Sequence, residues 1–216
     1  MDADQVAALQ ALIAPTGWLD RTAGFARALR RQARTPNGLL IVGTRAAEPW
    51  HMTAHLASES EYAGIPELTP TLIRWTPPPG APAHLAVGLD RLSEAGRRET
   101  LLVVSQEAAP AELLERVHDV RRAGAAVFAL DQGDPELDEL AHEFLQVSPA
   151  LAPMSFEGAQ HLVSAATVTG LPDPAGRIFP PRDRRLAAGR PHDRSLRGRL
   201  ARVLDAVSGT QPDLHR

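Results

Sequence analysis

The chain has 216 residues, no cysteine and a formal net charge of −3, and its 23 basic residues are all arginines. These counts exclude disulfides, thiolate catalysis, cysteine-ligated metals, lysine Schiff bases and a phosphate loop of the Walker type, which needs its lysine. Hydrophobic residues make up 44% of the chain, enough for the core of one α/β domain.

Short apolar runs alternate with segments of helical periodicity along most of the chain. This alternation predicts a parallel sheet covered by helices on both faces. We expect strands over 39–42, 71–75, 101–104, 125–130 and 144–147. Helices are expected over 2–14, 17–34, 50–62, 110–123 and 156–169, with a short helix between the last two strands. A further helix is expected through Leu85, Leu89 and Leu92 and stops near Gly96.

The composition changes after Gly170. Residues 171–193 are rich in proline, glycine and arginine, and residues 177–202 carry nine arginines against two aspartates. Residues 195–207 return to helical spacing, with an apolar stripe through Leu196, Leu200 and Val203. We therefore expect one domain over 1–170, an arginine-rich arm over 171–193, and a C-terminal helix and tail over 194–216.

Several stretches resemble the sugar isomerase (SIS) domain family. They are AGRRETLLVVS, ELLERVHDVRRAGAAVFALDQGDPELDELA, SFEGAQHLVSAA and the earlier GLLIVGTRAAEPWHMTAHLASESEYAGIP. The resemblance covers roughly residues 15–170. The chain is most similar to the sedoheptulose 7-phosphate isomerase group, which includes the DnaA initiator-associating proteins. The resemblance implies a three-layer α/β/α sandwich of the flavodoxin or Rossmann type with a five-stranded parallel sheet. It also implies a homo-oligomer, a dimer or tetramer, that binds phosphosugars.

The loop that binds phosphate in this family is altered in the present sequence. The family pattern Ser-x-Ser-Gly-x-Thr is met by Ser105, whereas Glu107 replaces the second serine and Pro110 replaces the threonine. Pro110 removes an N–H donor, and a carboxylate about 4 Å from a phosphate charge costs roughly 4 kcal/mol at an effective dielectric near 20. The expected ligand-binding residues are Gly43, Thr44, Arg45, Ser105, Gln106, Glu107 and His161.

In the family, the first loop is a glycine-rich turn that ends in serine. This chain has Gly43-Thr44-Arg45 at that place. Arg45 adds a positive charge to the first loop, as Glu107 adds a negative charge to the second. We hypothesise that Arg45 and Glu107 pair across the two loops; the alternative is that both point to solvent.

Two pairs of histidine and glutamate recur at a spacing of four residues. His55 and Glu59 match the family's His-x-x-x-Glu, and Glu157 and His161 repeat the spacing on the later helix. Glu59, His55 and Glu157 are the candidate acid–base residues of an aldose–ketose isomerase. The same four side chains are the candidate ligands of a divalent metal such as zinc. The alternative is a set of helix-surface polar residues at a subunit interface.

Asp131 follows the fourth predicted strand, either as a functional carboxylate at the sheet edge or, as we favour, as a turn-forming residue before Gln-Gly-Asp-Pro.

For function we favour an SIS-like protein that binds a carbohydrate derivative or acts as a regulatory or interaction module without catalysis. The alternative is a phosphosugar isomerase with an atypical ligand. An interaction protein acting through the arginine-rich arm has less support. The chain starts without a basic segment followed by an apolar one, so we expect a soluble, cytoplasmic protein without membrane contact. We expect no nucleic-acid binding by the acidic main body.

Overall fold

The computed structural model describes residues 17–147 and 155–170 of the chain. Five parallel strands form a single sheet in the order β2-β1-β3-β4-β5. They are β1 (Leu39–Gly43), β2 (Pro70–Ile73), β3 (Thr100–Ser105), β4 (Ala126–Asp131) and β5 (Glu143–Gln146). This is the strand order of flavodoxin-like sheets.

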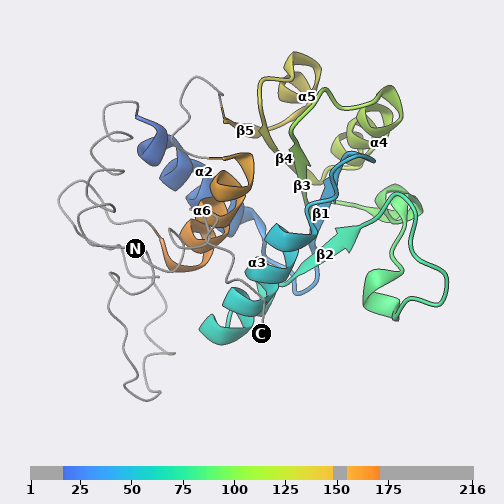
Figure 1. Cartoon of the computed structure of the whole chain (residues 1–216), viewed down its shortest axis with the longest axis horizontal. Helices are drawn as coiled ribbons and strands as arrows, with labels where there is room; N and C mark the ends of the chain where they lie inside the picture. The colour runs from blue at the N-terminus through green and yellow to red at the C-terminus, as the bar shows by residue number, and fades with distance from the viewer. Residues whose placement is uncertain (1–16, 148–154, 171–216) are drawn as a thin grey trace, which may run out of the picture.

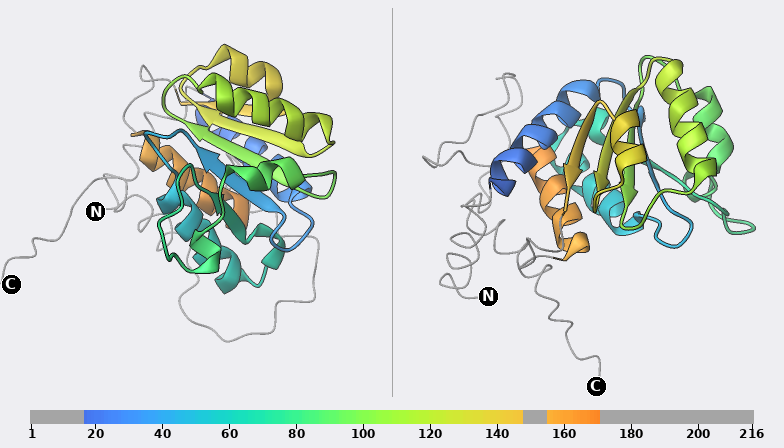
Figure 2. Two further views of the ribbon diagram at one scale, coloured as in Figure 1. Left: turned by 90° about the vertical axis from the view of Figure 1, so that its right-hand side faces the viewer. Right: turned by 90° about the horizontal axis from the view of Figure 1, so that it is seen from above.

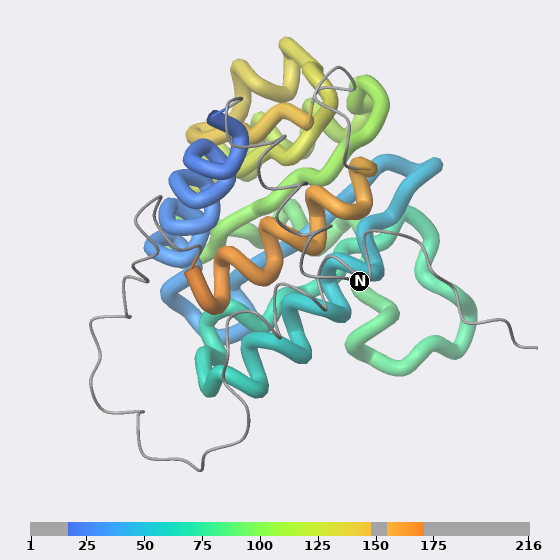
Figure 3. The backbone as a smooth tube through the Cα atoms, turned by 60° about the vertical axis from the view of Figure 1, so that its left-hand side comes forward, coloured from blue at the N-terminus to red at the C-terminus, as the bar shows by residue number. Residues whose placement is uncertain are grey.

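Helices cover both faces of this sheet, as Figures 1 and 2 show. One face carries α2 (Trp18–Gln32), α3 (Trp50–Ala63) and α6 (Phe156–Thr169), which lie side by side in Figure 3. The other face carries α4 (Ala111–Arg122), α5 (Pro135–Leu140) and the 3₁₀ helix η4 (Leu89–Glu94). Because neither face is open to water, every residue of β1 and β3 is buried, which explains their continuous apolar sequences.

Local sequence signals fix where these helices begin. The Ser155 hydroxyl accepts a hydrogen bond from the Gly158 N–H at 3.0 Å and so caps α6. Asp134 caps α5 by accepting from the N–H groups of Glu136 and Leu137, with Pro135 at the first helical position. Inside the sandwich, Phe25 of α2 meets Phe128 of β4 edge-on, with ring centroids 5.5 Å apart.

The predicted α/β sandwich with a five-stranded parallel sheet is confirmed. The helix expected through Leu85, Leu89 and Leu92 is wrong: the segment forms two 3₁₀ helices, η3 (Ala83–Leu85) and η4, which residues 86–88 separate. Another short 3₁₀ helix, η2 (Pro66–Leu68), precedes β2. The predictions for 2–14, the arginine-rich arm and the C-terminal helix, with the domain boundaries that depend on them, lie outside the described residues. Within the described ranges, none of the helices combines the length and the apolar character that crossing a membrane requires.

Asp131, the last residue of β4, is completely buried and forms the turn that leads into α5. Its Oδ1 accepts hydrogen bonds from the N–H groups of Gly133 and Asp134, at 2.6 and 3.3 Å, which confirms the turn-forming interpretation. Among the described atoms, Oδ2 of Asp131 and Oδ1 of Asp138 are both buried without a donor. Burial, together with the nearby Asp138 carboxyl, raises the pKa of Asp131 to about 6 despite the two backbone hydrogen bonds.

We predict that Asp131→Asn removes a pH-dependent loss of stability. The pKa of Asp131 is raised from 3.8 to about 6 in the folded chain, so the folded state binds more protons than the unfolded state between these values. The stability of the wild-type chain therefore falls as the pH rises from about 4 to about 6 and stays lower above. An amide at position 131 keeps the Oδ1 acceptor and can donate to Asp138, so the variant should be the more stable chain at pH 7.5.

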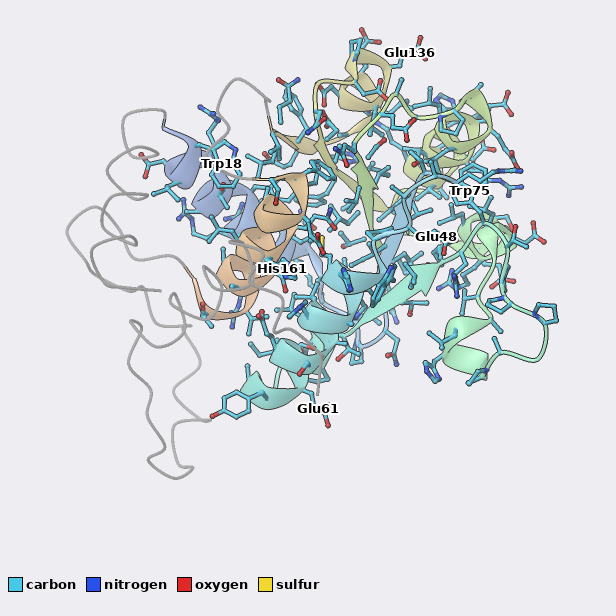
Figure 4. All side chains as sticks on the ribbon, viewed as in Figure 1. Trp18, Glu48, Glu61, Trp75, Glu136 and His161 are labelled. Carbon is cyan, nitrogen blue, oxygen red and sulfur yellow. The ribbon has the colours of Figure 1, made fainter. Side chains whose placement is uncertain are left out.

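Urea unfolding at pH 4.5 and pH 7.5 checks this prediction, with Glu136→Gln on the exposed side of α5 as the matched control (Figure 4). The control should retain the wild-type pH dependence. If the stability of Asp131→Asn falls with rising pH as steeply as that of the wild type, the Asp131 carboxyl beside Asp138 is not the cause of the pH dependence.

Candidate ligand site at the carboxyl edge of the sheet

The carboxyl ends of β1 and β3 lie side by side, because Gly43 is in register with Val104 and Ser105 follows at the end of β3. The chain passes from β1 to β2 on one side and then crosses from β2 to β3 on the other side of β1, so the strand order reverses here. In open parallel sheets such a switch point is where ligands bind. The six loop residues predicted as ligand contacts, 43–45 and 105–107, all lie at this edge.

The β1 loop folds back onto its own strand. A Cβ atom at Gly43 would lie 2.2 Å from the Ala47 carbonyl oxygen and 2.5 Å from Cδ of Pro49, so only glycine fits without a shift of the loop. Thr44 is buried, and its hydroxyl accepts from the Ala47 N–H at 3.2 Å. The Thr44 hydroxyl and the Ala47 N–H are therefore bound to each other within the loop.

Trp75 and Glu48 hold the closed loop against the end of β2 (Figure 4). The Trp75 indole N–H donates to the Gly43 carbonyl oxygen at 2.8 Å. The Glu48 carboxylate accepts from Nε of Arg74 and from the Trp75 backbone N–H, both at 2.9 Å. Both carboxylate oxygens of Glu48 are thereby bound, which gives the loop a rigid base.

The expected pair between Arg45 and Glu107 is wrong. Arg45 is 3.7 Å from the Glu112 carboxylate, and its guanidinium lies 5.0 Å from the centre of the Trp75 ring. Glu112 is in the first turn of α4, where a carboxylate complements the positive end of the helix. The arginine therefore faces a carboxylate fixed on a helix, whereas Glu107 lies exposed in the loop before it.

The loop between β3 and α4 is also turned inward. The buried Ser105 hydroxyl donates to the Glu107 carbonyl oxygen of the same loop. The Ala109 N–H donates to Oδ2 of Asp134 at 2.7 Å, so an internal carboxylate occupies a donor that a phosphate would need. Pro110 supplies no N–H at the start of α4. Among the predicted contacts of this loop, the side chains of Gln106 and Glu107 are exposed.

A second group of polar residues lies where α3 and α6 pack together, and we call it the α3–α6 seam: His51, His55 and Glu59 on α3 with Glu157, His161 and Ser164 on α6. His51 Nδ1 lies 2.7 Å from Oε1 of Glu157. One turn further, the rings of His55 and His161 meet edge-on with centroids 4.3 Å apart. In the next turn the Ser164 hydroxyl donates to Oε2 of Glu59 at 3.2 Å.

The seam brings together the four residues of the two predicted His/Glu pairs, because α3 and α6 run parallel and in register (Figure 3). Both helices return from the same edge of the sheet, so both begin there. Figure 4 shows His161 on α6 beside α3. The first turn of the seam, with His51 and Glu157, is thus at the same edge as the β1 and β3 loops.

Burial lowers the pKa of His161, the imidazole of His55 lowers it further, and Glu157 acts in the opposite direction. The folded environment therefore favours a neutral His161 at pH 7. A neutral imidazole has one N–H donor and one acceptor nitrogen, and this combination suits a hydroxyl group better than a phosphate.

The four predicted metal ligands, His55, Glu59, Glu157 and His161, do not form one cluster in the described residues. In the described part of the chain, no group of three or more histidine or carboxylate side chains has the arrangement to hold a metal ion. The carboxylates are engaged separately, Glu157 with His51 and Glu59 with Ser164. The proposed zinc chemistry therefore has no assembled ligand set in this structure.

Among the contributors to this edge that were not assigned to the site from the sequence are His51, Trp75 and Asp134. His51 is four residues before His55 and therefore on the same face of α3, a signal that could have placed it in the seam. Asp134 contacts Ala109 from 25 residues away, and Trp75 contacts Gly43 from 32 residues away. No local pattern indicates either contact.

No protein-family model and no curated protein sequence matches this chain. Among solved structures, it is similar to a proposed phosphosugar isomerase from Silicibacter pomeroyi at 16% identity and a TM-score of 0.46, covering 76% of this chain and 47% of that one. It is also similar to the Vibrio vulnificus NanR protein complexed with ManNAc-6P, at 15% identity and a TM-score of 0.49, covering 75% and 60%. The chain spans less than two thirds of the length of either protein.

We predict that Gly43→Ala destabilises the chain by about 1–3 kcal/mol, the usual cost of forcing a methyl group into a filled site. The reason is the 2.2 Å approach to the Ala47 carbonyl oxygen, which only a shift of the loop backbone can relieve. The control is Gly96→Ala, where a Cβ would meet nothing within 4 Å. Thermal unfolding of both variants measures the difference. Equal melting temperatures for the two would show that the β1 loop is not closed as described.

Proposed function

We propose that this protein is an SIS-like protein that binds a carbohydrate derivative at the carboxyl edge of its sheet, with the α3–α6 seam in place of the phosphate loop. Binding serves a regulatory or interaction role and is not coupled to isomerisation. The sequence resemblance to the SIS family supports the ligand class. The observation that carries the proposal is a difference between two parts of this edge. The loops after β1 and β3 leave few groups free to bind an anion, whereas the α3–α6 seam keeps groups that suit hydroxyls.

The loop half has few groups left for an anion. The hydroxyls of Thr44 and Ser105 bond within their own loops, and the Ala109 N–H is bound to Asp134. The side chain of Arg45 is directed toward Glu112, and Glu107 adds a further negative charge. A phosphate entering here would have to displace an internal carboxylate and approach two others.

The seam half retains groups that suit hydroxyls. His161 is held neutral by its surroundings, and His55 lies against it at a ring distance of 4.3 Å. Glu157 begins the same helix, half-exposed beside His51. A neutral imidazole can both donate a hydrogen bond to a sugar hydroxyl and accept one from it, and a carboxylate can accept one. A neutral sugar needs no positive charge in its site.

The alternative function is a phosphosugar isomerase that uses Glu59, His55 and Glu157 for proton transfer. The side chains of Glu59 and His55 share one helix face, and this observation favours the alternative. The closed phosphate loop opposes it, because an isomerase of this class draws on phosphate binding to hold its substrate in place.

We predict that a neutral sugar stabilises the protein as well as its phosphorylated form does. The matched probes are N-acetylmannosamine and its 6-phosphate, compared by thermal shift on the full chain at equal concentrations. A ligand at one hundred times its Kd adds about 2.7 kcal/mol to the stability of the folded state, which gives a measurable rise in Tm. Equal shifts are expected, since the loop contributes no phosphate contact.

A panel of other neutral hexoses and aminosugars covers the choice of sugar. The absence of a shift with every sugar would overturn carbohydrate binding. A 6-phosphate that binds about tenfold more tightly than its sugar would show that the loop after β3 binds phosphate. Exchange of the C2 proton of a phosphosugar with deuterated solvent, lost on Glu59→Gln, would establish the isomerase instead.

A further inference from the structure

The first turn of the α3–α6 seam contains a carboxylate–imidazole pair that the sequence interpretation did not assign. His51 is the second residue of α3, and Glu157 is the second residue of α6. The two side chains are 48% and 57% exposed, so the pair is accessible to a ligand from solvent. Its position at the beginning of both helices places it at the carboxyl edge of the sheet.

The contact with Glu157 determines what the other ring nitrogen of His51 can do. Because a carboxylate only accepts, the Nδ1 of His51 at 2.7 Å must carry the proton. When the ring carries this single proton, its lone pair is on Nε2, on the opposite side of the imidazole. Within residues 17–147 and 155–170, the hydrogen bonds of His51 include none to Nε2.

Trp50 provides an apolar surface beside the His51 ring. Its indole is 56% exposed, and its ring centre lies 3.4 Å from that of His51. A sugar ring has an apolar face of C–H groups and an edge of hydroxyls. An exposed aromatic ring next to a directed acceptor matches both parts.

We propose that His51 is a ligand-contacting residue whose Nε2 accepts a hydrogen bond from a hydroxyl of an uncharged, polyhydroxylated ring that rests against Trp50. Glu157 is the positioning residue that holds the imidazole in the required tautomer. This inference rests on the proposed function and deepens it, because it adds two contact residues and selects neutral sugars. The side chains of His51 and Glu157 are both exposed, and a contact between exposed side chains contributes little to folding stability, so His51 can be replaced without loss of the fold.

Two substitutions separate the two nitrogens of His51. The amide of His51→Asn can donate to Glu157 in place of Nδ1 but does not reach the position of Nε2. The longer His51→Gln reaches the Nε2 position but no longer donates to Glu157 from the Nδ1 position. His84→Asn, on the exposed η3 helix, is the matched control because it changes a histidine away from the seam.

The probe is N-acetylmannosamine, titrated calorimetrically into the full chain. His51→Asn should weaken binding about tenfold or more, the effect of losing one hydrogen bond of about 1.4 kcal/mol. His51→Gln should stay within about threefold of the wild type, and His84→Asn should be unchanged. Trp50→Ala should weaken binding without altering the Tm of the free protein.

The role of Glu157 has its own spectroscopic readout. In the wild-type chain, nitrogen-15 NMR of the histidine rings should show His51 as the tautomer protonated at Nδ1, and Glu157→Gln should produce a mixture of tautomers. A protonated Nε2 in the free wild-type protein would overturn the positioning role.

The failure of this inference differs from that of the proposed function. Unchanged sugar affinity in His51→Asn, with binding lost in His161→Ala, would overturn the role of His51 and leave carbohydrate binding at the seam intact. A wild-type chain that binds no sugar would overturn both. Binding lost in His51→Asn and retained in His51→Gln would support the contact at Nε2.

Discussion

The parallel, in-register packing of α3 against α6 is the constraint on which the candidate site depends. Each helix follows a strand of a parallel sheet and returns across the same face, so both begin at the carboxyl edge. The fixed register then places three successive turns opposite one another, as His51 with Glu157, His55 with His161, and Glu59 with Ser164. A shift of one residue in either helix would separate all three pairs.

Two parts of the same edge of the sheet differ in the hydrogen-bonding groups that they leave free. At the ends of β1 and β3, side chains that could hold an anion close their own loops, and Asp134 binds the Ala109 N–H from within the protein. In the seam, imidazoles and a carboxylate remain half-exposed. We therefore propose that the switch point of this sheet binds hydroxyls in preference to phosphates.

The sequence allowed the fold to be predicted well, because buried parallel strands and amphipathic helices have local signatures. The segment 156–169 was predicted with the boundaries that α6 has. The four-residue spacing also identified the two polar helix faces of the seam. Their mutual contact, and that of His51 with Glu157 across 106 residues, depends on how the helices pack. Arg45 was assigned to Glu107 by charge alone; the rigid first turn of α4 presents Glu112 to it instead.

The central claim is that a ligand contacts the seam and not the loop after β3. Amide and histidine-ring shift changes in NMR spectra of the labelled protein, recorded during titration with N-acetylmannosamine, test it directly. We expect changes at His51, His55 and His161 and none over 105–109. Changes confined to 105–109, with the three histidine rings unaffected, would contradict it.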